Sequence, residues 1–412
     1  MNSFKKAYCR TFQTIFKIAL PLLPYRKPKI IDSVKGIPDI LAKKKCDTVL
    51  IITDSGIMKL GLTTRLENAL DNSNIPYYIY DKTVANPTTT NVAEAVEVYK
   101  EHSCNAIIGF GGGSSIDCAK AVGACIAKPN QPLSKMKGIL KVHKKLPLLI
   151  AIPTTAGTGS ETTLASVITD AETRHKYPIN DFPLIPKYAV LDPKVTLSLP
   201  PSITATTGMD ALTHAVEAYI GNSTTYGTRK DATMAVELIF NNLDTAYSNG
   251  NDITARRNML KAAFYAGCAF TKSYVGYVHA VAHSLGGEYN VPHGLANAVL
   301  LPFVLEEYGE SIYKKLHRLA IAAGIADKET SDEDAAKAFI QAIKDMKLRY
   351  NIGDTIDSIQ EEDIPKLAKY ADKEANPLYP VPVLMNAKEL EKFYYMVMGG
   401  SHNDSRTDKA VG

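Results

Sequence analysis

AIIGFGGGSSIDCAK, residues 106–120, joins a short apolar run to a glycine-rich turn and then to a helical pattern. Ala106–Phe110 predicts a buried strand, and Ile116–Ile126 predicts the helix that follows it. Glycines at such a turn let the backbone approach a phosphate closely, and the helix start adds free N–H groups and a positive dipole end. A glycine-rich turn between a strand and a helix can also be no more than a tight connection. Residues 106–120 alone therefore support a phosphate-binding loop and a plain turn equally.

This glycine-rich turn departs from the standard G-x-G-x-x-G pattern. Ile116 stands where the third glycine belongs, and the turn follows the third predicted strand rather than the first. No acidic residue lies about twenty residues downstream to hold the adenine ribose, whereas Asp54 lies at the end of the first predicted strand. We therefore expect a dinucleotide site built differently from the standard Rossmann half.

The surrounding half of the chain alternates short β-branched runs with helical patterns, which is typical of a parallel sheet with crossover helices. The remaining predicted elements are strands at Val49–Thr53, Tyr77–Tyr80 and Leu148–Ile152, helices at Leu60–Leu70 and Ala93–Tyr99, and β-like pieces in residues 164–192. Beyond Pro200-Pro201, residues 203–347 are rich in Ala and Leu at helical spacing. We predict a parallel-sheet α/β domain over residues 1–200 and an all-α domain over residues 201–412, with a frayed tail over residues 401–412.

A second polar loop, PTTAGTGSE at residues 153–161, follows the predicted strand Leu148–Ile152. It places four hydroxyl groups and two glycines in nine residues at the carboxyl end of a strand. Ligands of parallel sheets bind at that edge, and a plain turn rarely needs so many polar groups. We interpret the loop as a ligand-binding loop.

Four of the nine histidines fall within 80 residues, in the predicted helical half. Asp210 and His214 are four residues apart, as are His279 and His283, so each pair shares one helix face; His293 follows a proline. Taken alone, each histidine can be a core residue with its hydrogen bonds satisfied, and each Asp/His pair can be only a hydrogen bond along a helix face. Together they favour a divalent metal site, because titratable groups on apolar faces are costly unless paired or metal-bound. Imidazole and carboxylate without thiolate suit Fe²⁺ or Zn²⁺.

Composition excludes several classes of protein. Apolar residues make up 45% and charged residues 22%, the balance of a folded chain. The net charge is only +4, without a basic cluster of the kind that binds nucleic acid. The six cysteines form no C-x-x-C and no paired spacing, which indicates buried thiols in a reducing compartment.

The N-terminus has the outline of a signal peptide, with basic residues before Thr11–Pro24. Lys17, Pro21 and Pro24 interrupt the apolar run, and no cleavage site follows. We expect an amphipathic segment that packs on the body or on a partner subunit, with contact to a membrane surface as the alternative. No stretch has the length of a membrane span, and we expect a cytoplasmic protein.

The chain resembles the iron-containing (group III) alcohol dehydrogenases from about Lys29 to the end of its helical half. The motifs that carry the resemblance are Asn86-Pro87-Thr88, GGGSSIDCAK (111–120), PTTAGTGSE (153–161), TGMDALTHAVEAY (207–219) and HAVAHSLGGEYNVPHGLANAVLLP (279–302). The last two are long and specific. The first thirty residues are the visible departure from the family, because they are longer and more apolar than a typical start.

The resemblance implies the two-domain architecture shared with dehydroquinate synthase, with metal and substrate between the domains. It implies metal ligands at Asp210, His214, His279 and His293, and a substrate-lining aromatic residue at Phe270. The implied NAD contacts are Asp54, Asn86, Gly112, Gly113, Ser114, Asp117, Thr154, Thr155, Thr158, Val167 and Lys176. A homodimer or larger homo-oligomer is the usual assembly.

The implied activity is NAD(H)-dependent interconversion of a small primary alcohol or diol and its aldehyde, with Fe²⁺ or Zn²⁺ stabilising the alkoxide. His283 is either the proton relay or a group that orients His279. Asp54 either binds the adenine ribose, which favours NAD over NADP, or caps the helix near Ile57. Phe270, Tyr274 and Tyr277 predict a small, neutral substrate.

Two rival functions compete with this interpretation. A lyase or cyclase of the dehydroquinate synthase kind needs several Arg and Lys residues around an acidic substrate, and the segments near the predicted ligands are mostly apolar. A non-catalytic NAD-binding protein has little reason to retain four metal ligands.

Overall fold

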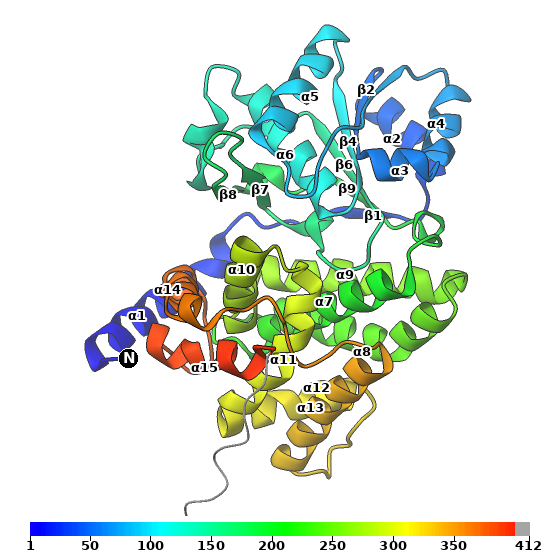
Figure 1. The fold of residues 1–412 in the computed structure, drawn as a ribbon. Coiled ribbons are helices and arrows are strands. Elements are labelled where there is room, and N and C mark those ends of the chain that lie inside the picture. The colour runs from blue at the N-terminus through cyan, green and yellow to red at the C-terminus, as the bar shows by residue number, and fades with distance from the viewer. Residues whose placement is uncertain (400–412) are drawn as a thin grey trace, which may run out of the picture.

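The computed structural model describes residues 1–399 as an α/β half above a helical half, joined through short connections (Figure 1). The predicted frayed tail at residues 401–412 lies outside the described residues. The architecture confirms the predicted fold class, a parallel-sheet domain followed by an all-helical one.

A six-stranded parallel sheet forms the centre of the α/β half, in the order β1-β9-β6-β4-β2-β3. The strands are β1 (Lys29–Ile31), β2 (Val49–Ile52), β3 (Tyr77–Tyr80), β4 (Ala106–Gly111), β6 (Leu148–Pro153) and β9 (Tyr188–Val190). Val49 and Ile51 of β2 pack in the core on one face of the sheet, and Leu50 and Ile52 pack in the core on the other. The central strands are buried on both faces, which is why they read as continuous apolar runs.

Five helices cover this sheet, and a small second sheet flanks it. The helices are α2 (Ile37–Lys44), α3 (Ser55–Lys59), α4 (Thr64–Asp71), α5 (Thr89–Glu101) and α6 (Gly113–Ala127). The small sheet pairs β5 (Gly138–Ile139), β8 (Lys176–Asn180) and β7 (Ala165–Thr169) in that order. It accounts for most of the β-like pieces predicted in residues 164–192.

Two local predictions are wrong. The predicted helix Leu60–Leu70 is a turn over residues 60–63 followed by α4, because Gly61 takes a positive φ of 63° and ends the helical path. The glycine-rich turn follows β4, the fourth strand rather than the third, because the short β1 gives no clear periodic signal.

The helical half is built around α7 (Pro201–Ile220), a helix with 15 buried residues among its 20. Pro201 occupies the first helical position, where its missing N–H costs nothing, which explains why Pro200-Pro201 marks the change of composition. The other helices are α8 (Tyr226–Ser248), α9 (Ile253–Ser273), α10 (Tyr277–Tyr289), α11 (His293–Tyr308), α12 (Tyr313–Ala322), α13 (Asp332–Arg349), α14 (Ile364–Ala375) and α15 (Ala387–Val397).

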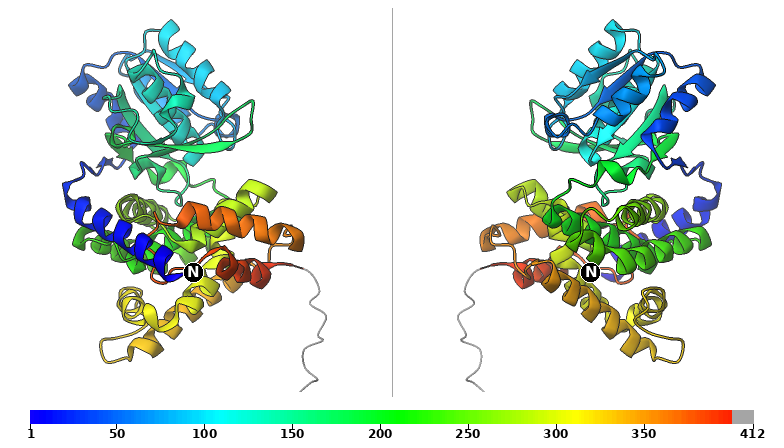
Figure 2. Two further views of the ribbon diagram at one scale, coloured as in Figure 1. Left: turned by 90° about the vertical axis from the view of Figure 1, so that its left-hand side faces the viewer. Right: turned by 90° about the vertical axis from the view of Figure 1, so that its right-hand side faces the viewer.

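The N-terminal helix α1 (Ser3–Ala19) lies along the outside of the helical half, away from the sheet (Figure 2). Gln13, which is 3% exposed, donates to the carbonyl of Tyr379, and Arg10 donates to the carbonyls of Val381 and Pro382. The expected amphipathic segment therefore packs on the body of the protein. Among residues 1–399, no helix is both long and apolar enough to cross a membrane.

The six cysteines carry free thiols, as their spacing predicts. Cys9, Cys104, Cys118 and Cys268 are buried, and Cys46 and Cys125 are partly so. The fold therefore does not depend on disulfides.

Candidate metal and cofactor site

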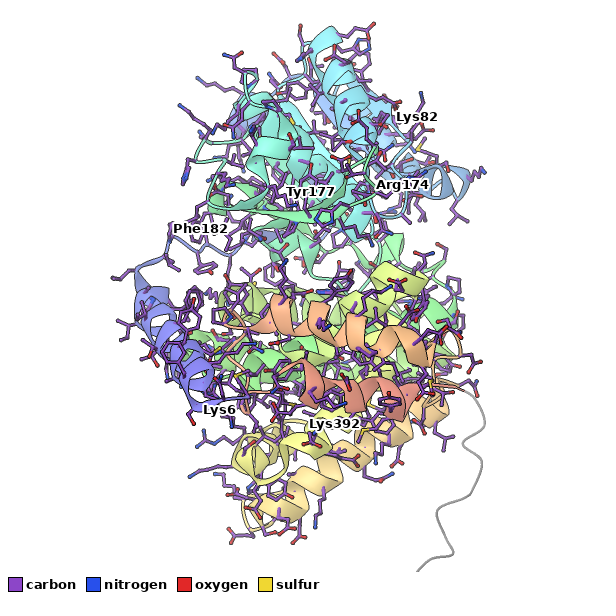
Figure 3. All side chains as sticks on the ribbon, turned by 60° about the vertical axis from the view of Figure 1, so that its left-hand side comes forward. Lys6, Lys82, Arg174, Tyr177, Phe182 and Lys392 are labelled. Atoms are coloured by element: carbon purple, nitrogen blue, oxygen red, sulfur yellow. The ribbon has the colours of Figure 1, made fainter. Side chains whose placement is uncertain are left out.

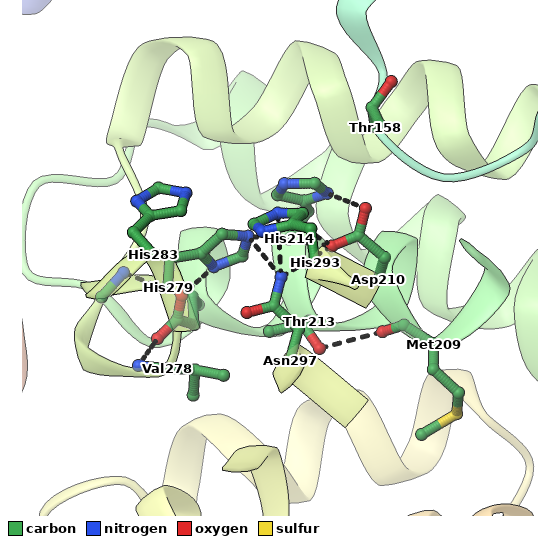
Figure 4. Close-up of polar contacts among 12 residues, drawn as sticks. Thr158, Met209, Asp210, Thr213, His214, Val278, His279, His283, His293 and Asn297 are labelled. Carbon is green, nitrogen blue, oxygen red and sulfur yellow. Dashed lines mark hydrogen bonds and ion pairs between the residues drawn. The ribbon is translucent and has the colours of Figure 1, made fainter. Parts of the chain in front are cut away.

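Asp210, His214, His279 and His293 converge in the helical half, with one ligand atom of each within 4.8 Å of the others. Asp210 and His214 come from consecutive turns of α7, His279 from α10, and His293 from the first position of α11 (Figure 4). Asp210 Oδ1 lies 3.4 Å from His293 Nε2 and 4.0 Å from His279 Nε2. The structure therefore brings together the four residues expected to bind the metal.

Close helix packing makes this convergence possible. Gly294 follows His293 at the start of α11, and a Cβ there would lie 2.6 Å from the carbonyl oxygen of Thr206 on α7. A glycine is therefore required where α11 meets α7. The close approach brings His293 to the carboxylate of Asp210.

The surroundings keep the three imidazoles neutral. Burial lowers the pKa of His214 and places the pKa of His279 well below its ordinary value. Desolvation also lowers the pKa of His293 to about 4, although 38% of its side chain is exposed. Neutral imidazole is the form that ligates a metal, so the donor set is ready near neutral pH.

Unsatisfied polar atoms indicate that a cation fits this cluster. His214 Nδ1 is buried without a hydrogen-bond partner. The amide nitrogen of Asn297 lies 2.7 Å from Asp210 Oδ1 and 3.1 Å from the Nε2 atoms of both His279 and His293. An amide has two protons to donate, so three acceptors compete for them. A divalent ion bound by the imidazoles and carboxylate resolves this excess of acceptors.

Glu217, one helical turn beyond His214 on α7, holds His279 from behind. Its carboxylate accepts from Nδ1 of His279 at 2.6 Å and from the backbone N–H groups of Gly276 and Val278 at 2.8 Å each. This contact sets the tautomer that turns Nε2 of His279 toward Asp210. Burial raises the pKa of Glu217 to about 7, against the effect of these three donors.

His283 lies beside the cluster without joining it. Its ring stacks on that of His293 with centroids 5.2 Å apart, and its Nδ1 is 2.6 Å from Glu374 Oε1. Tyr379 donates to the same carboxylate oxygen at 2.7 Å. Burial alone would lower the pKa of His283, but the Glu374 carboxylate raises it above its ordinary value. His283 is 42% exposed, so it faces solvent as well as the site.

Of the two tyrosines predicted to line the substrate pocket, Tyr277 lies in the protein core instead. Phe270 stacks on His214 at 4.2 Å, next to the metal cluster, and Tyr274 packs against Tyr379 at 6.1 Å. Tyr277 instead lies in the core, where its hydroxyl contacts the backbone of Met385. Its position in a helical core stripe could not be distinguished from a pocket position by sequence spacing alone.

The glycine-rich turn begins the helix α6 at the carboxyl edge of the sheet. Gly111 takes a φ of 147°, and a Cβ there would overlap Ser115, so only glycine fits. Asp54 lies at the same edge: its Oδ1 caps α3 by accepting from the N–H of Ile57, while its Oδ2 is 3.4 Å from Ser115 Oγ. The expected helix cap is thus present, with the second carboxylate oxygen directed at the turn.

The other predicted cofactor residues belong to this turn, to the loop before it, to the second loop and to the small sheet. Asn86 has a φ of 58° and donates its N–H to Ser114 Oγ at 3.3 Å. Gly112, Gly113 and Ser114 start α6, Thr154, Thr155 and Thr158 belong to the second loop, and Lys176 pairs with Thr169 beside Thr88.

The second loop, residues 153–161, runs from the edge of the sheet to the helix α7, which carries Asp210 and His214. Its start pairs with the first loop, since Thr154 N–H donates to the carbonyl of Gly111 at 3.0 Å. A Cβ at Gly157 would lie 2.7–3.0 Å from Thr207 of α7, the helix that carries Asp210 and His214. In the view of Figure 4, Thr158 of this loop lies above Asp210. The loop therefore contacts both the glycine-rich turn and the helix that carries two of the four clustered residues.

A buried charged network that sequence patterns did not single out holds this loop on α6. Lys120 donates to Thr163 Oγ1 and to the carbonyl of Ala165, both at 2.7 Å, and to Ser160 Oγ at 3.2 Å. Asp117, predicted as a cofactor contact, accepts from Ser160 Oγ at 2.6 Å. It also accepts from the N–H of Val167, another predicted contact, at 3.0 Å.

Burial shifts the charges in this network toward neutrality. It lowers the pKa of Lys120 to about 8 and raises that of Glu161 to about 7. Glu161 is 1% exposed, and its Oε1 has no hydrogen-bond partner. The two groups thus lie close to titration near neutral pH.

The comparisons with known proteins agree along the chain. The family model of iron-containing alcohol dehydrogenase matches residues 31–193, and that of the Fe-containing alcohol dehydrogenase family, C-terminal, matches residues 204–398. Alcohol dehydrogenase 4 of Schizosaccharomyces pombe is 40% identical over 337 residues, 80% of this chain and 79% of that protein. The NAD-dependent methanol dehydrogenase of Bacillus methanolicus is 36% identical over 345 residues, 82% and 89% of the two chains.

Solved structures are similar over most of their length. A 1,3-propanediol oxidoreductase superposes with a TM-score of 0.86 at 33% identity, covering 90% of this chain and 97% of that one. The sulfoacetaldehyde reductase of Bifidobacterium kashiwanohense, solved in complex with NAD⁺, superposes with a TM-score of 0.80 at 28% identity, covering 90% and 98%.

Proposed function

This chain belongs to the iron-containing alcohol dehydrogenase family, and we propose that it interconverts small primary alcohols or diols and their aldehydes with NAD(H). The observation that carries the proposal is the cluster of Asp210, His214, His279 and His293, which the loop 153–161 joins to the sheet edge. Relatives named as NAD-dependent methanol dehydrogenase and 1,3-propanediol oxidoreductase support this cofactor and this class of substrate.

The four residues would hold Fe²⁺ or Zn²⁺. When bound, the metal supplies a Lewis acid that favours the deprotonated alcohol, and the nicotinamide supplies the hydride acceptor. Glu217 keeps Nε2 of His279 free by accepting a hydrogen bond from the N–H at Nδ1. Phe270, stacked on His214, covers one side of the cluster with an apolar ring and limits access of water to it.

We assign the exchange of the alcohol proton with solvent to His283. Its ring stacks on that of His293 and is 42% exposed, so it lies between the site and water. Glu374 accepts a hydrogen bond from Nδ1 of His283. Nε2 of His283 is therefore the atom that takes up the alcohol proton. The contact of Glu217 with Nδ1 of His279 supports this choice over the alternative role of His283, orientation of His279. A His283→Ala enzyme with an unchanged pH–rate profile would refute the relay.

The glycine-rich turn and the second loop would bind the dinucleotide. The start of α6 offers free N–H groups to the pyrophosphate, and glycines at 111–113 permit a close approach. We propose that Asp54 receives the ribose hydroxyls through Oδ2, because Oδ1 is engaged in capping α3. This arrangement favours NAD(H) over NADP(H).

We also propose a homodimer or larger homo-oligomer that acts in the cytoplasm. The six free cysteines support a reducing compartment. The family assignment weighs against the lyase or cyclase and against a non-catalytic dinucleotide-binding protein.

Steady NADH formation from alcohols tests the proposal. Protein purified without oxygen, and loaded in parallel with Fe²⁺ or Zn²⁺, is assayed with methanol, butanol and 1,3-propanediol and with both NAD⁺ and NADP⁺. We expect continuous turnover with NAD⁺ that a chelator abolishes and the metal restores. A cyclase would form no net NADH, and a binding protein would show no turnover with any alcohol.

A further inference from the structure

Tyr274, the residue that follows α9, has a backbone conformation that a bulky side chain rarely adopts. Its φ of 59° and ψ of −174° lie in a region that is occupied almost only by glycine. A strained backbone of this kind persists only where the surrounding contacts hold it, and such residues gather at functional sites. The contacts that hold Tyr274 therefore bear on what the nearby site can do.

Tyr274 belongs to the aromatic surroundings of the metal cluster. Phe270, which precedes it by about one helical turn on α9, stacks on His214 with ring centroids 4.2 Å apart. The ring of Tyr274 lies 6.1 Å from that of Tyr379. The hydroxyl of Tyr379 donates to Glu374, the carboxylate that also binds the proposed proton relay. Tyr274 thus adjoins this side of the site through its own neighbours.

Phe16 of α1 supports Tyr274 from the outside of the protein. The centroids of the two rings are 5.2 Å apart and the rings are tilted by 57°, a separation at which aromatic side chains are in contact. Phe16 is only partly exposed, in contrast to Phe4 on the outer face of the same helix. It also precedes residue 31, where the match to the family model begins. The matched region of the chain therefore does not supply this support.

The N-terminal segment is tied to both halves of the protein, which fixes the position of Phe16. Side chains of α1 donate hydrogen bonds to the backbone carbonyls of residues 379–382 in the helical half. After the helix, the ring of Tyr25 meets that of Phe182 edge-on at 5.0 Å, and Arg26 donates to the backbone of the α/β half at 2.7 Å. Figure 3 shows Phe182 at the lower edge of the α/β half, on the side of α1.

We propose that Phe16 is a positioning residue that limits the length of the substrate, because it holds Tyr274 as the wall at which the carbon chain of a short primary alcohol ends. Without the ring of Phe16, the strained backbone of Tyr274 can relax and the wall can withdraw. One methylene group in an apolar pocket changes specificity by about 10–200-fold, so a small displacement has a large effect. This inference rests on the proposed alcohol dehydrogenase activity and adds a substrate limit to it.

The values of kcat/KM for ethanol, butanol and hexanol test the role of Phe16. Phe16→Ala removes the ring behind Tyr274, so we expect the ratio of hexanol to ethanol to rise by about 10-fold or more. Phe4→Ala makes the same change on the same helix at a side chain that is 85% exposed, and should keep the wild-type ratio. Melting temperatures show which variants are folded. Phe16→Leu retains apolar contact and should change the ratio in the same direction by a smaller factor.

A double-mutant cycle shows whether Phe16 acts through Tyr274. Tyr274→Ala removes the proposed wall itself, so Phe16→Ala/Tyr274→Ala should have the same hexanol-to-ethanol ratio as Tyr274→Ala alone. Additive effects of the two substitutions would contradict the proposed path. A purely structural role of Phe16 would lower kcat/KM for all alcohols alike and leave the ratio unchanged, which would overturn the proposal.

Binding of carboxamides gives the same comparison without turnover. Acetamide and hexanamide are neutral analogues of the aldehydes, and calorimetry in the presence of NADH measures their dissociation constants. We expect Phe16→Ala to strengthen the binding of hexanamide relative to acetamide by a factor similar to that for the alcohols. Wild-type selectivity of the folded Phe16→Ala protein for alcohols and amides would refute the inference. A wild type without turnover would instead refute the proposed function, and the amide comparison would still decide the role of Phe16.

Discussion

Glu217 accepts a hydrogen bond from Nδ1 of His279 at 2.6 Å, so that the opposite nitrogen of the ring faces Asp210. Both residues are buried, and Glu217 also binds the backbone at the start of α10. One carboxylate therefore fixes the position of the helix and the tautomer of the histidine proposed to bind the metal. Through this contact Glu217, which is not one of the four clustered residues, would affect a metal bound by them.

Glu217→Gln should weaken metal binding by roughly 10–100-fold, as is typical when such an outer partner is lost. Glutamine has one acceptor oxygen, so it cannot serve His279 and both backbone N–H groups together. Competition with a chelator for Zn²⁺, on protein shown to be folded, measures the effect. Glu374→Gln, a change at the carboxylate beside the non-ligand His283, is the control and should bind metal as the wild type does.

Asp54→Gly should raise kcat/KM for NADP⁺ relative to NAD⁺, because a carboxylate at the adenine ribose repels a 2′-phosphate. The same change removes the cap of α3, at a cost of about 1 kcal/mol. Asp54→Asn separates the two roles, since asparagine retains a capping oxygen without the charge. A loss of stability with no change in cofactor preference would leave Asp54 as a cap only, and a wild type that prefers NADP⁺ would contradict the prediction outright.

Replacing Glu161 should change how stability depends on pH. Its pKa is about 7 in the folded protein because of burial, against 4.5 ordinarily. Between these values the folded protein holds a proton that the unfolded chain has released, so this group lowers the free energy of unfolding as pH rises from 4.5 to 7.

Urea unfolding of the wild type and Glu161→Gln across this pH range measures the effect. We expect the difference between their unfolding free energies to change by about 1–3 kcal/mol in favour of the variant as pH rises. Glu172→Gln alters an exposed carboxylate in the same half and serves as the control. Parallel pH dependences for the wild type and Glu161→Gln would contradict the prediction.

The substrate should be neutral. Phe270 lies on the metal cluster through its stack with His214, and the sequence around His279 is mostly apolar. We expect kcat/KM for butyraldehyde or 3-hydroxypropanal to exceed that for sulfoacetaldehyde, the anion for which one similar structure is named. Faster reduction of sulfoacetaldehyde would require a cation near the site and would refute this prediction.

Local chemistry made the elements around the site predictable. Strand β2 carries a continuous apolar run because helices cover both faces of the sheet. Four-residue spacing placed Asp210 and His214 on one face of α7, as observed. The boundaries of the elements were harder to predict. The turn at Gly61 depends on a positive φ, and the short strand β1 depends on pairing with β9, and neither is contained in the pattern of apolar residues.

The supporting contacts could not be predicted from sequence for the same reason. Glu217 and Asn297 are ordinary polar residues on helices until the packing brings each to a ligand from another element. Their signal is weak but present, since Asn297 stands four residues after His293. The partner of His283, by contrast, is Glu374, 91 positions away, and no spacing rule links the two.

Whether Asp210, His214, His279 and His293 together bind a metal can be decided from the metal content of variants in which each is replaced. Asp210→Ala, His214→Ala, His279→Ala and His293→Ala are purified without oxygen beside the wild type and His283→Ala, and their bound metal is measured by mass spectrometry. We expect about one Fe²⁺ or Zn²⁺ per chain in the wild type and in His283→Ala, and loss of most metal from each of the other four variants. Full metal occupancy in the His279 or His293 variant would contradict it.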